Sequence, residues 1–323
     1  MDRGLGNRQP RRRHHAHSLM MWAGGALLVG FVVAAVLAPL LAPYDPRLST
    51  GRPLRPPTDG HLLGTNDLGQ DILSQLLHGA RSSLLVAFSV AAISTVLSWS
   101  VGLVAGFSRR AEAPTMLVVD LLLALPSIPL YLLVLTLLGP SRRNLILVLA
   151  LLSWPGFARV VRSVVQGVRS APYVEASLAL GARKRHIMLR HLLPATLDVL
   201  PTKLILTVRF AVFAEATLGF LGVSSNDTIS WGTMLNWAFA DPLLFARPVW
   251  PWLVLPPTLA IITLLLATVW VSTGLALGQE FHRGRFKSGR LRPFPDSGGP
   301  ALAQIRVPGG DWSPGCPGPR LMR

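Results

Sequence analysis

Three ionisable residues, Asp120, Arg209 and Glu215, lie inside long apolar runs of the sequence. Charged groups are costly in such a setting, and they usually face the interior of a helix bundle, where they pair with one another or line a path for a polar substrate. Arg209 and Glu215 are six residues apart, which places them about 120° apart around one helix, so they cannot form an i,i+4 pair. We expect Asp120 to make a structural ion pair or to lie near an interface. For Arg209, a structural role and a place in a substrate pathway or partner interface are equally open.

A second group of chemically capable side chains, His61, Asp67 and Asp71, stands in one polar block. A histidine and two carboxylates could bind a metal ion or act as an acid–base pair, but their spacing matches no common ligand pattern. The Asn, Asp and Gly residues around them favour a structured turn, which we expect to lead into an interfacial helix over residues 72–78. The only cysteine, Cys316, excludes an internal disulfide or a cysteine metal site. We therefore predict no catalytic residue, no bound cofactor and no metal.

The composition is that of a membrane protein. Half of the 323 residues are apolar, only 14% are charged, and mean hydropathy is +0.46. A soluble protein of this length would need more charge on its surface. The formal net charge of +16 is spread over short segments between apolar runs, which membrane orientation explains better than nucleic-acid binding. We expect the lipid bilayer, and not nucleic acid, as a partner.

Six apolar runs are long enough to cross a hydrocarbon core, which takes about 20 residues. We interpret the first run as a retained anchor, because it is longer than the apolar region of a signal peptide. The basic N-terminal tail, residues 1–18, and the C-terminal tail, residues 283–323, are predicted to be disordered, and residues 19–282 form the membrane domain. The predicted spans are residues 20–41, 82–107, 116–138, 145–165, 196–221 and 252–277.

Lys and Arg residues set the predicted orientation. They gather in the N-terminal tail, in the pair Arg109 and Arg110, between the fourth and fifth spans, and after the sixth span. By the positive-inside rule, both termini and the segment between the fourth and fifth spans lie in the cytoplasm. Arg142 and Arg143 are the exception, because they fall in a segment that is predicted to lie outside.

The segment between the fourth and fifth spans, residues 170–195, reads as two short helices hinged at Gly181. Pro172 suits the first position of a helix, where its missing N–H costs nothing. Glu175 follows in the first turn, where the helix dipole favours a carboxylate. The second helix opens with a basic run from Arg183 to Arg185, which is the unfavourable sign for that end. The basic run therefore indicates an interaction outside the helix, either with lipid headgroups or with an acidic partner.

The spacing of residues in this segment resembles the EAA loop of ABC importer permeases. In that loop, Glu-Ala-Ala is followed after three residues by Gly, and after nine more by an aliphatic residue, one further residue and Leu-Pro. The spacing holds here, with serine for the second alanine and histidine at the aliphatic position. The matching residues are Glu175, Ala176, Ser177, Gly181, His191, Leu193 and Pro194.

Other stretches resemble the dipeptide/oligopeptide/nickel branch of that family. The Leu-Gly-Thr loop between the first two spans is similar to that of its C-type permease subunit. The resemblance covers roughly residues 20–280, but the usual acidic-basic ending is weak, because residues 279–282 read Gln-Glu-Phe-His. The matching stretches are residues 63–71, 79–84, 153–159, 215–222 and 230–232.

The resemblance implies an all-α protein with the type I ABC importer permease fold, in a bacterial-type plasma (inner) membrane. It implies that residues 170–195 form a coupling helix, with Arg183 beside the matched residues, that docks on a cytoplasmic ATPase. The implied partners are a B-type permease subunit, two ATPase subunits and an extracytoplasmic substrate-binding protein. No Walker lysine motif is visible, so ATP would be bound by the partners and the chain would not be an enzyme.

The resemblance implies a permease subunit that forms the translocation pathway of an ATP-driven importer. Di- and oligopeptides are the favoured substrates, and nickel, glutathione and opines are the alternatives. Two other classes of protein fit the sequence less well. An integral-membrane enzyme would need a nucleophile, a base or metal ligands gathered at one depth, and a channel would need a filter-like segment or a ring of like charges. The spans show neither feature.

Overall fold

The computed structural model describes residues 10–224 and 228–288, with side chains described from residue 20 to residue 275 outside that gap. Within these ranges the chain is helical, and its strand-like pairings are two isolated bridges, Thr58 with His61 and Thr65 with Asp71. The helices are α1 Pro10–Val36, α2 Ala38–Leu41, α3 Ile72–Phe107, α4 Arg109–Ala124, α5 Ser127–Leu138, α6 Arg142–Ser153, α7 Pro155–Arg169, α8 Pro172–Ala179, α9 Lys184–Ile187, the π-helix η1 Met188–Leu192, α10 Leu193–Leu197, α11 Leu200–Phe220, α12 Trp231–Ala240 and α13 Trp250–Ser288.

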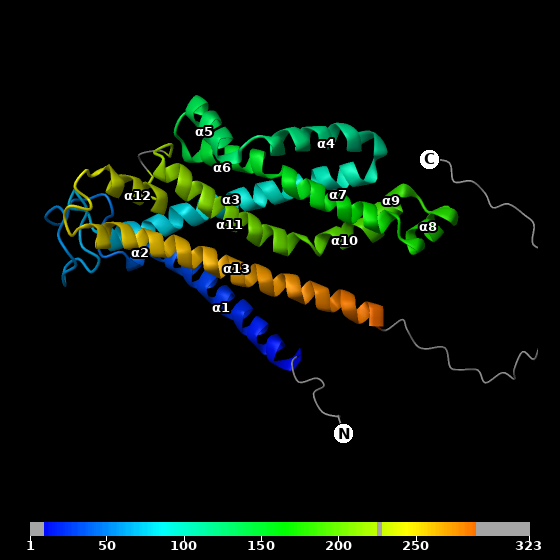
Figure 1. Ribbon diagram of the computed structural model, residues 1–323, viewed down its shortest axis with the longest axis horizontal. Helices are drawn as coiled ribbons and strands as arrows, with labels where there is room; N and C mark the ends of the chain where they lie inside the picture. Colours follow the sequence, from blue (N-terminus) through cyan, green and yellow to red (C-terminus); the bar gives the residue numbers. More distant parts are fainter. Residues whose placement is uncertain (1–9, 225–227, 289–323) are drawn as a thin grey trace, which may run out of the picture. The chain divides into compact units, whose positions relative to one another are not determined.

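Helix α3 is the element on which most of the others pack: it contacts α1, α2, α4, α6, α7, α11 and α12 (Figure 1). Its contact with α7 is very close. A Cβ added at Gly102 would lie 2.6 Å from the carbonyl oxygen of Ala158, and one added at Gly106 would lie 2.6 Å from Cβ of Val165. Two glycines four residues apart let helix backbones approach in this way, which is how many membrane helices associate.

Helix α3 runs unbroken from Ile72, so the prediction of a separate interfacial helix over residues 72–78 is wrong. Gly79, which could have marked a break, is instead a packing position, because an added Cβ would meet Cδ1 of Trp231 at 3.1 Å. Asp71, the residue before the helix, caps it, because its side chain accepts a hydrogen bond from the N–H of Ser74.

Three helices among the described residues are long and apolar enough to cross a membrane: Ile72–Phe107, Arg142–Arg169 and Trp250–Leu275. Helices α4 and α5 make a fourth if they count as one span, but they are bent by 92°. The apolar part of α1, Met20–Val36, is shorter, and α11 carries three ionisable residues. The count is therefore three or four helices, against the six predicted spans.

The tails are described only in part. Helix α1 begins at Pro10 and α13 ends at Ser288, so residues 10–18 and 283–288 are helical where we predicted disorder. Residues 1–9 and 289–323, which complete the predicted tails, lie outside the described residues.

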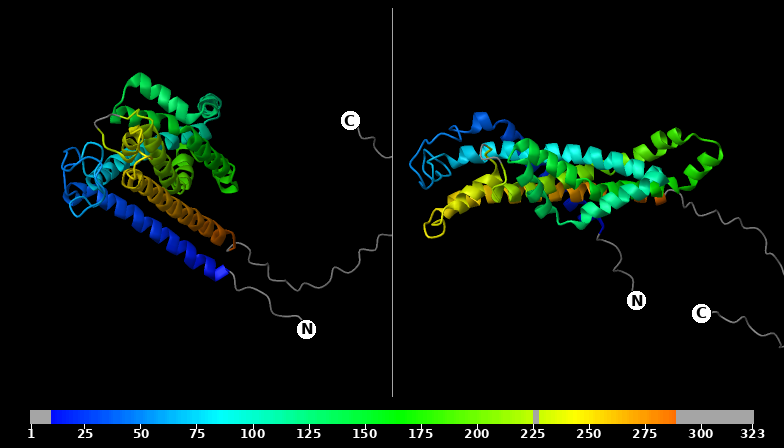
Figure 2. Two further views of the ribbon diagram at one scale, coloured as in Figure 1. Left: turned by 60° about the vertical axis from the view of Figure 1, so that its left-hand side comes forward. Right: turned by 90° about the horizontal axis from the view of Figure 1, so that it is seen from above.

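The described residues between Pro10 and Phe281 form one compact unit with two distinct ends. The segment 42–71 and α12 lie at one end, and α8 and α9 lie at the other (Figures 1 and 2). A large buried cluster joins α3, α6 and α11 to α12. A smaller one, which includes Val165 and Val174, joins α7 to the short helices.

We predict that Gly102→Val destabilises the protein by about 1–3 kcal/mol, because the added side chain overpacks the contact with α7. Gly30→Val is the matched control, since a Cβ at Gly30 meets nothing within 4 Å. Thermal unfolding of the two purified variants in detergent measures the difference. Equal midpoints for both variants would show that the α3–α7 contact does not need glycine.

Candidate functional site

The segment after α7 folds as two short helices on either side of Gly181. Helix α8 ends in a Schellman motif, in which the N–H of Ala182 bonds to the carbonyl of Ser177 and the N–H of Gly181 to that of Leu178, both at 3.0 Å. Gly181 has a φ of +85°, a left-handed conformation that costs an L-residue roughly 1–2 kcal/mol. The predicted hinge at Gly181 is therefore a real turn between helices.

One side of the segment formed by α8 and α9 is buried, and the other side is exposed. Val174 and Ile187 are buried against Val165 of α7 and fix the two helices in place. Glu175 and Ala176, both part of the predicted coupling set, are exposed on α8.

The tip of the turn carries an exposed leucine. Leu180 lies directly before Gly181, and 89% of its surface is exposed. The sequence reading missed Leu180, although an apolar residue next to a helix-ending glycine is a visible signal.

The serine and histidine that depart from the usual loop pattern both have local partners. Ser177 Oγ donates a hydrogen bond to the carbonyl of Tyr173 at 2.8 Å, and it is satisfied within α8. The ring of His191 lies 5.6 Å from that of Tyr173, centroid to centroid. The histidine therefore packs across the segment, where an aliphatic residue would otherwise lie.

Leu193 and Pro194 open α10 directly after the π-helix η1. Proline has no N–H, and in a regular α-helix its ring would clash with the carbonyl four residues earlier. In the wider π-turn the N–H of Leu193 bonds to the carbonyl of Met188, which relieves that conflict. Trp99 Nε1 of α3 donates to Thr196 Oγ1 at 3.1 Å and ties α10 to the central helix.

The basic run is exposed. Arg183 caps α9 through its backbone, since its carbonyl accepts from the N–H of His186 at 2.8 Å. The side chains of Arg183, Lys184 and Arg185 are exposed, and none makes an ion pair with another described residue. Their predicted role in meeting acidic groups stays a prediction.

Of the ionisable residues in the apolar runs, Asp120 has a clear partner. Its Oδ1 forms an ion pair with Arg159 of α7, and both side chains are at least half exposed. A second pair joins the same helices, with Glu112 Oε1 bound by Arg162 and by Gln166 Nε2 at 2.9 Å. Asp120 thus makes the interhelix ion pair that we expected, and Glu112 is a partner that the sequence reading did not single out.

Glu215 is buried, with 2% of its surface exposed. The hydroxyl groups of Ser83 and Ser230 lie beside its carboxyl group, and Arg142 acts on it as a nearby cation. Arg142 also donates to Ser82 Oγ at 3.3 Å. One carboxyl oxygen of Glu215, Oε2, accepts no hydrogen bond from a described residue.

The nearby carboxyl group of Glu215 and the hydroxyl group of Ser82 explain why an arginine stands at position 142. As expected, Arg209 is not the partner of Glu215. Its side chain is half-buried and makes neither an ion pair nor a hydrogen bond within the described part of the chain.

A cavity of about 470 Å³ lies between two helix bends and α11. One bend joins α4 to α5, and the other joins α6 to α7. Its walls are mostly apolar, with the polar groups of Ser127, Tyr131, Ser153 and Thr207 among them. Lys203 also lines it, and its Nζ lies 4.9 Å from the centre of the Phe157 ring. Lys203 has no carboxylate partner among the described residues.

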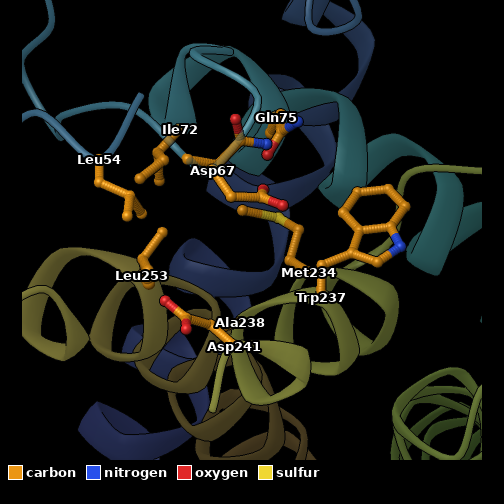
Figure 3. Close-up of a pocket in the computed structure, with 10 residues that line it drawn as sticks. Leu54, Asp67, Ile72, Gln75, Met234, Trp237, Ala238, Asp241 and Leu253 are labelled. Atoms are coloured by element: carbon orange, nitrogen blue, oxygen red, sulfur yellow. The ribbon is translucent and has the colours of Figure 1, made fainter. Parts of the chain in front are cut away.

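The polar block that contains His61, Asp67 and Asp71 lies at the end of the molecule opposite α8 and α9, and it is a structured turn, as expected. His61 Nδ1 lies 3.0 Å from Asp71 Oδ1, and Asp71 Oδ2 accepts from Ser74 N–H and Oγ at 2.8 and 2.7 Å. Asp67 points elsewhere, into a small pocket whose other side carries Asp241 (Figure 3). No group of three metal-ligating residues occurs in the part of the chain that was described.

Comparison with known proteins agrees with this architecture. Residues 95–277 match the family described as binding-protein-dependent transport system inner membrane component. The chain is 35% identical over 269 residues to the di/tripeptide transport system permease protein DppC of Pseudomonas aeruginosa, a match covering 80% of this chain and 87% of that protein. The chain belongs to this permease family. It is 34% identical over 255 residues to a Brucella suis protein named as a peptide permease, covering 78% and 83% of the two chains.

Membership in this permease family fixes the general role of the chain. It is the membrane-embedded permease subunit of an ABC importer, and it is not an enzyme. A transport system of this kind works with a substrate-binding protein and an ATPase.

We predict that Glu215→Ala destabilises the permease by about 1–3 kcal/mol, because it leaves a gap and unpaired hydroxyl groups. Glu215→Gln should cost less, since it keeps the size and the hydrogen-bonding capacity of the side chain. Thermal unfolding in detergent compares the two. If Glu215→Gln were as destabilising as Glu215→Ala, the charge itself would be what the fold needs, contrary to this account.

Proposed function

We propose that this permease subunit carries peptides, and that it forms the pathway together with a second, B-type permease subunit. The support is the similarity to proteins named for di/tripeptide and peptide transport along most of both chains. Nickel, glutathione and opines remain the alternative substrates within the same transporter class.

The proposed topology has six spans, with α1 and α11 as the first and fifth. Helix α11 can enter a membrane because two of its three ionisable groups are sheltered, Glu215 beside Arg142 and Lys203 at a cavity, and the third, Arg209, is half-buried. Both termini and the turn at Gly181 would lie in the cytoplasm. The contact of Arg142 with Ser82 supports this orientation, because it accounts for an arginine that otherwise breaks the positive-inside pattern.

The turn between α8 and α9 is proposed to dock on an ATPase subunit. The transporter would hold two ATPase subunits, one docked on this permease and the other on the B-type permease. The observation that carries this proposal is Leu180, which is 89% exposed at the tip of a turn built on Gly181. In this proposal the apolar side chain of Leu180, presented at the end of a helix, enters a groove on the ATPase. Glu175, Ala176 and Arg183 flank the tip and would complete the contact.

The packing behind the tip offers a route for motion. Val174 anchors α8 to α7 in one buried cluster, and α7 lies against α3 along the glycines of that helix. A movement of the docked ATPase would therefore shift α8 and α7 together as a rigid body, as in other switching proteins. Leu193 and Pro194 would pass the same movement to α11.

The cavity at Lys203 is proposed to lie on the transport pathway. It is of the size of a small-molecule site, and it offers several hydroxyl groups and one cation, Lys203, that has no carboxylate partner among the described residues. Arg209 lies further along the same helix and is also unpaired among the described residues.

We predict that Leu180→Asp and Gly181→Asp abolish capture of the ATPase. The first puts a charge in the docking groove, and the second strains the turn that presents the tip. Leu62→Asp is the matched control, because Leu62 is 66% exposed at the opposite end of the molecule. Co-purification of the ATPase and the stimulated rate of ATP hydrolysis are the measurements. Normal ATPase capture by Leu180→Asp would rule out this docking site.

For the pathway, Lys203→Met should leave assembly of the transporter intact and lower peptide uptake by roughly 10- to 150-fold, since a charge-assisted hydrogen bond contributes about 1.5–3 kcal/mol. Uptake and co-purification are measured separately. Arg209→Ala is tested in parallel: normal assembly with an altered substrate range supports a pathway role for Arg209. Loss of assembly in either variant would instead make that residue structural.

A further inference from the structure

A basic cavity of about 510 Å³ opens between the C-terminal end of α3 and the short helices α8 and α9. Four cationic side chains from three helices line it: Arg109 and Arg110 of α4, Arg169 of α7 and Lys184 of α9. Its remaining wall is largely apolar and includes Val174 and Leu178 of α8 and Ile187 of α9.

The positive charge of this cavity is not neutralised within the described chain. None of its four basic residues makes an ion pair with a described carboxylate. Glu112, close enough to attract Arg109, already binds Arg162 and Gln166 through the same oxygen. The cavity therefore favours an anionic ligand.

The site is also partly preorganised. Arg169 Nη1 donates to the carbonyl of Phe107 at 3.2 Å, which holds that guanidinium at the end of α3. Val174 and Ile187 are buried, so the apolar wall belongs to the fixed core. A ligand here meets a held cation and a firm apolar surface.

We propose that this cavity binds the phosphate headgroup of an anionic phospholipid, whose glycerol and first acyl carbons lie on the apolar wall. The cavity is lined by Phe107 and Ser108, where α3 and the proposed second span, residues 82–107, both end. Basic pockets between membrane helices on the cytoplasmic side bind such headgroups. The inference rests on the orientation given under the proposed function.

Two features favour a lipid over other anions. A free phosphate would leave most of the volume and the whole apolar wall unused. An acidic side chain of the ATPase would approach from the exposed tip, but Leu180 does not line the cavity, whereas the buried Val174 does.

A lipid in this position would bridge α4, α7 and α9. It would thereby stiffen the base of the turn that carries Leu180, and the coupling of the transporter would depend on anionic lipid.

Native mass spectrometry of the full-length protein in detergent, with added phosphatidylglycerol or phosphatidylcholine, tests the site. The wild type should retain one phosphatidylglycerol molecule in preference to phosphatidylcholine. Arg110→Gln/Lys184→Gln should weaken that binding roughly tenfold or more, because each cation near an anionic headgroup contributes about a fivefold factor. Arg143→Gln is the matched control, an exposed arginine at the other end of the membrane helices, and it should bind as the wild type does.

Equal retention of the two lipids by the wild type, or unchanged phosphatidylglycerol binding in the double variant, would overturn the proposal. Displacement of the lipid by inorganic phosphate alone would assign the cavity to a free anion. If the double variant does not fold, Arg110→Gln alone should give an intermediate loss. Leu180→Asp should retain the lipid, so failure of the ATPase-docking proposal is seen separately.

Discussion

The close contact between α3 and α7 is the interaction on which the rest of the permease depends. Gly102 and Gly106 remove the side chains that would hold the two backbones apart, and most of the other helices then pack on α3. Apolar side chains gain little by leaving lipid for protein, so such backbone proximity is a main source of helix association in membranes. Because α8 follows directly from α7 and is anchored to it by Val174, the exposed turn is connected to this contact through a buried apolar cluster.

The opposite end follows a different constraint, that polar groups away from water need partners. Glu215 lies among serine hydroxyl groups and near Arg142, and Asp71 both caps α3 and meets His61. These groups hold α3, α6, α11 and α12 in register below the structured turn. Arg142, which looks like a topology anomaly in the sequence, is thus a neighbour of a buried carboxylate.

Local signals in the sequence predicted local structure well. Pro172 does begin a helix and Gly181 does adopt the left-handed turn, since both follow from the backbone of a single residue. Features that depend on distant contacts were not predictable. The sequence alone could not show that Gly79 packs on Trp231, that Lys203 meets a cavity formed by two bent helix pairs, or that Leu180 stays uncovered. The number of spans also depends on tertiary contacts: apolar length in the sequence predicted six, whereas three or four described helices are long and apolar enough to cross a membrane.

The central claim about function is that the turn at Leu180 docks on the ATPase. Site-specific cross-linking at this turn tests the claim most directly. The chain has a single cysteine, so Leu180→Cys in a Cys316→Ser background gives one reactive thiol. In membranes that hold the assembled transporter, a short bifunctional reagent should join this position to the ATPase, and Leu62→Cys should give no such product. The account would be contradicted if Leu62→Cys, and not Leu180→Cys, were joined to the ATPase.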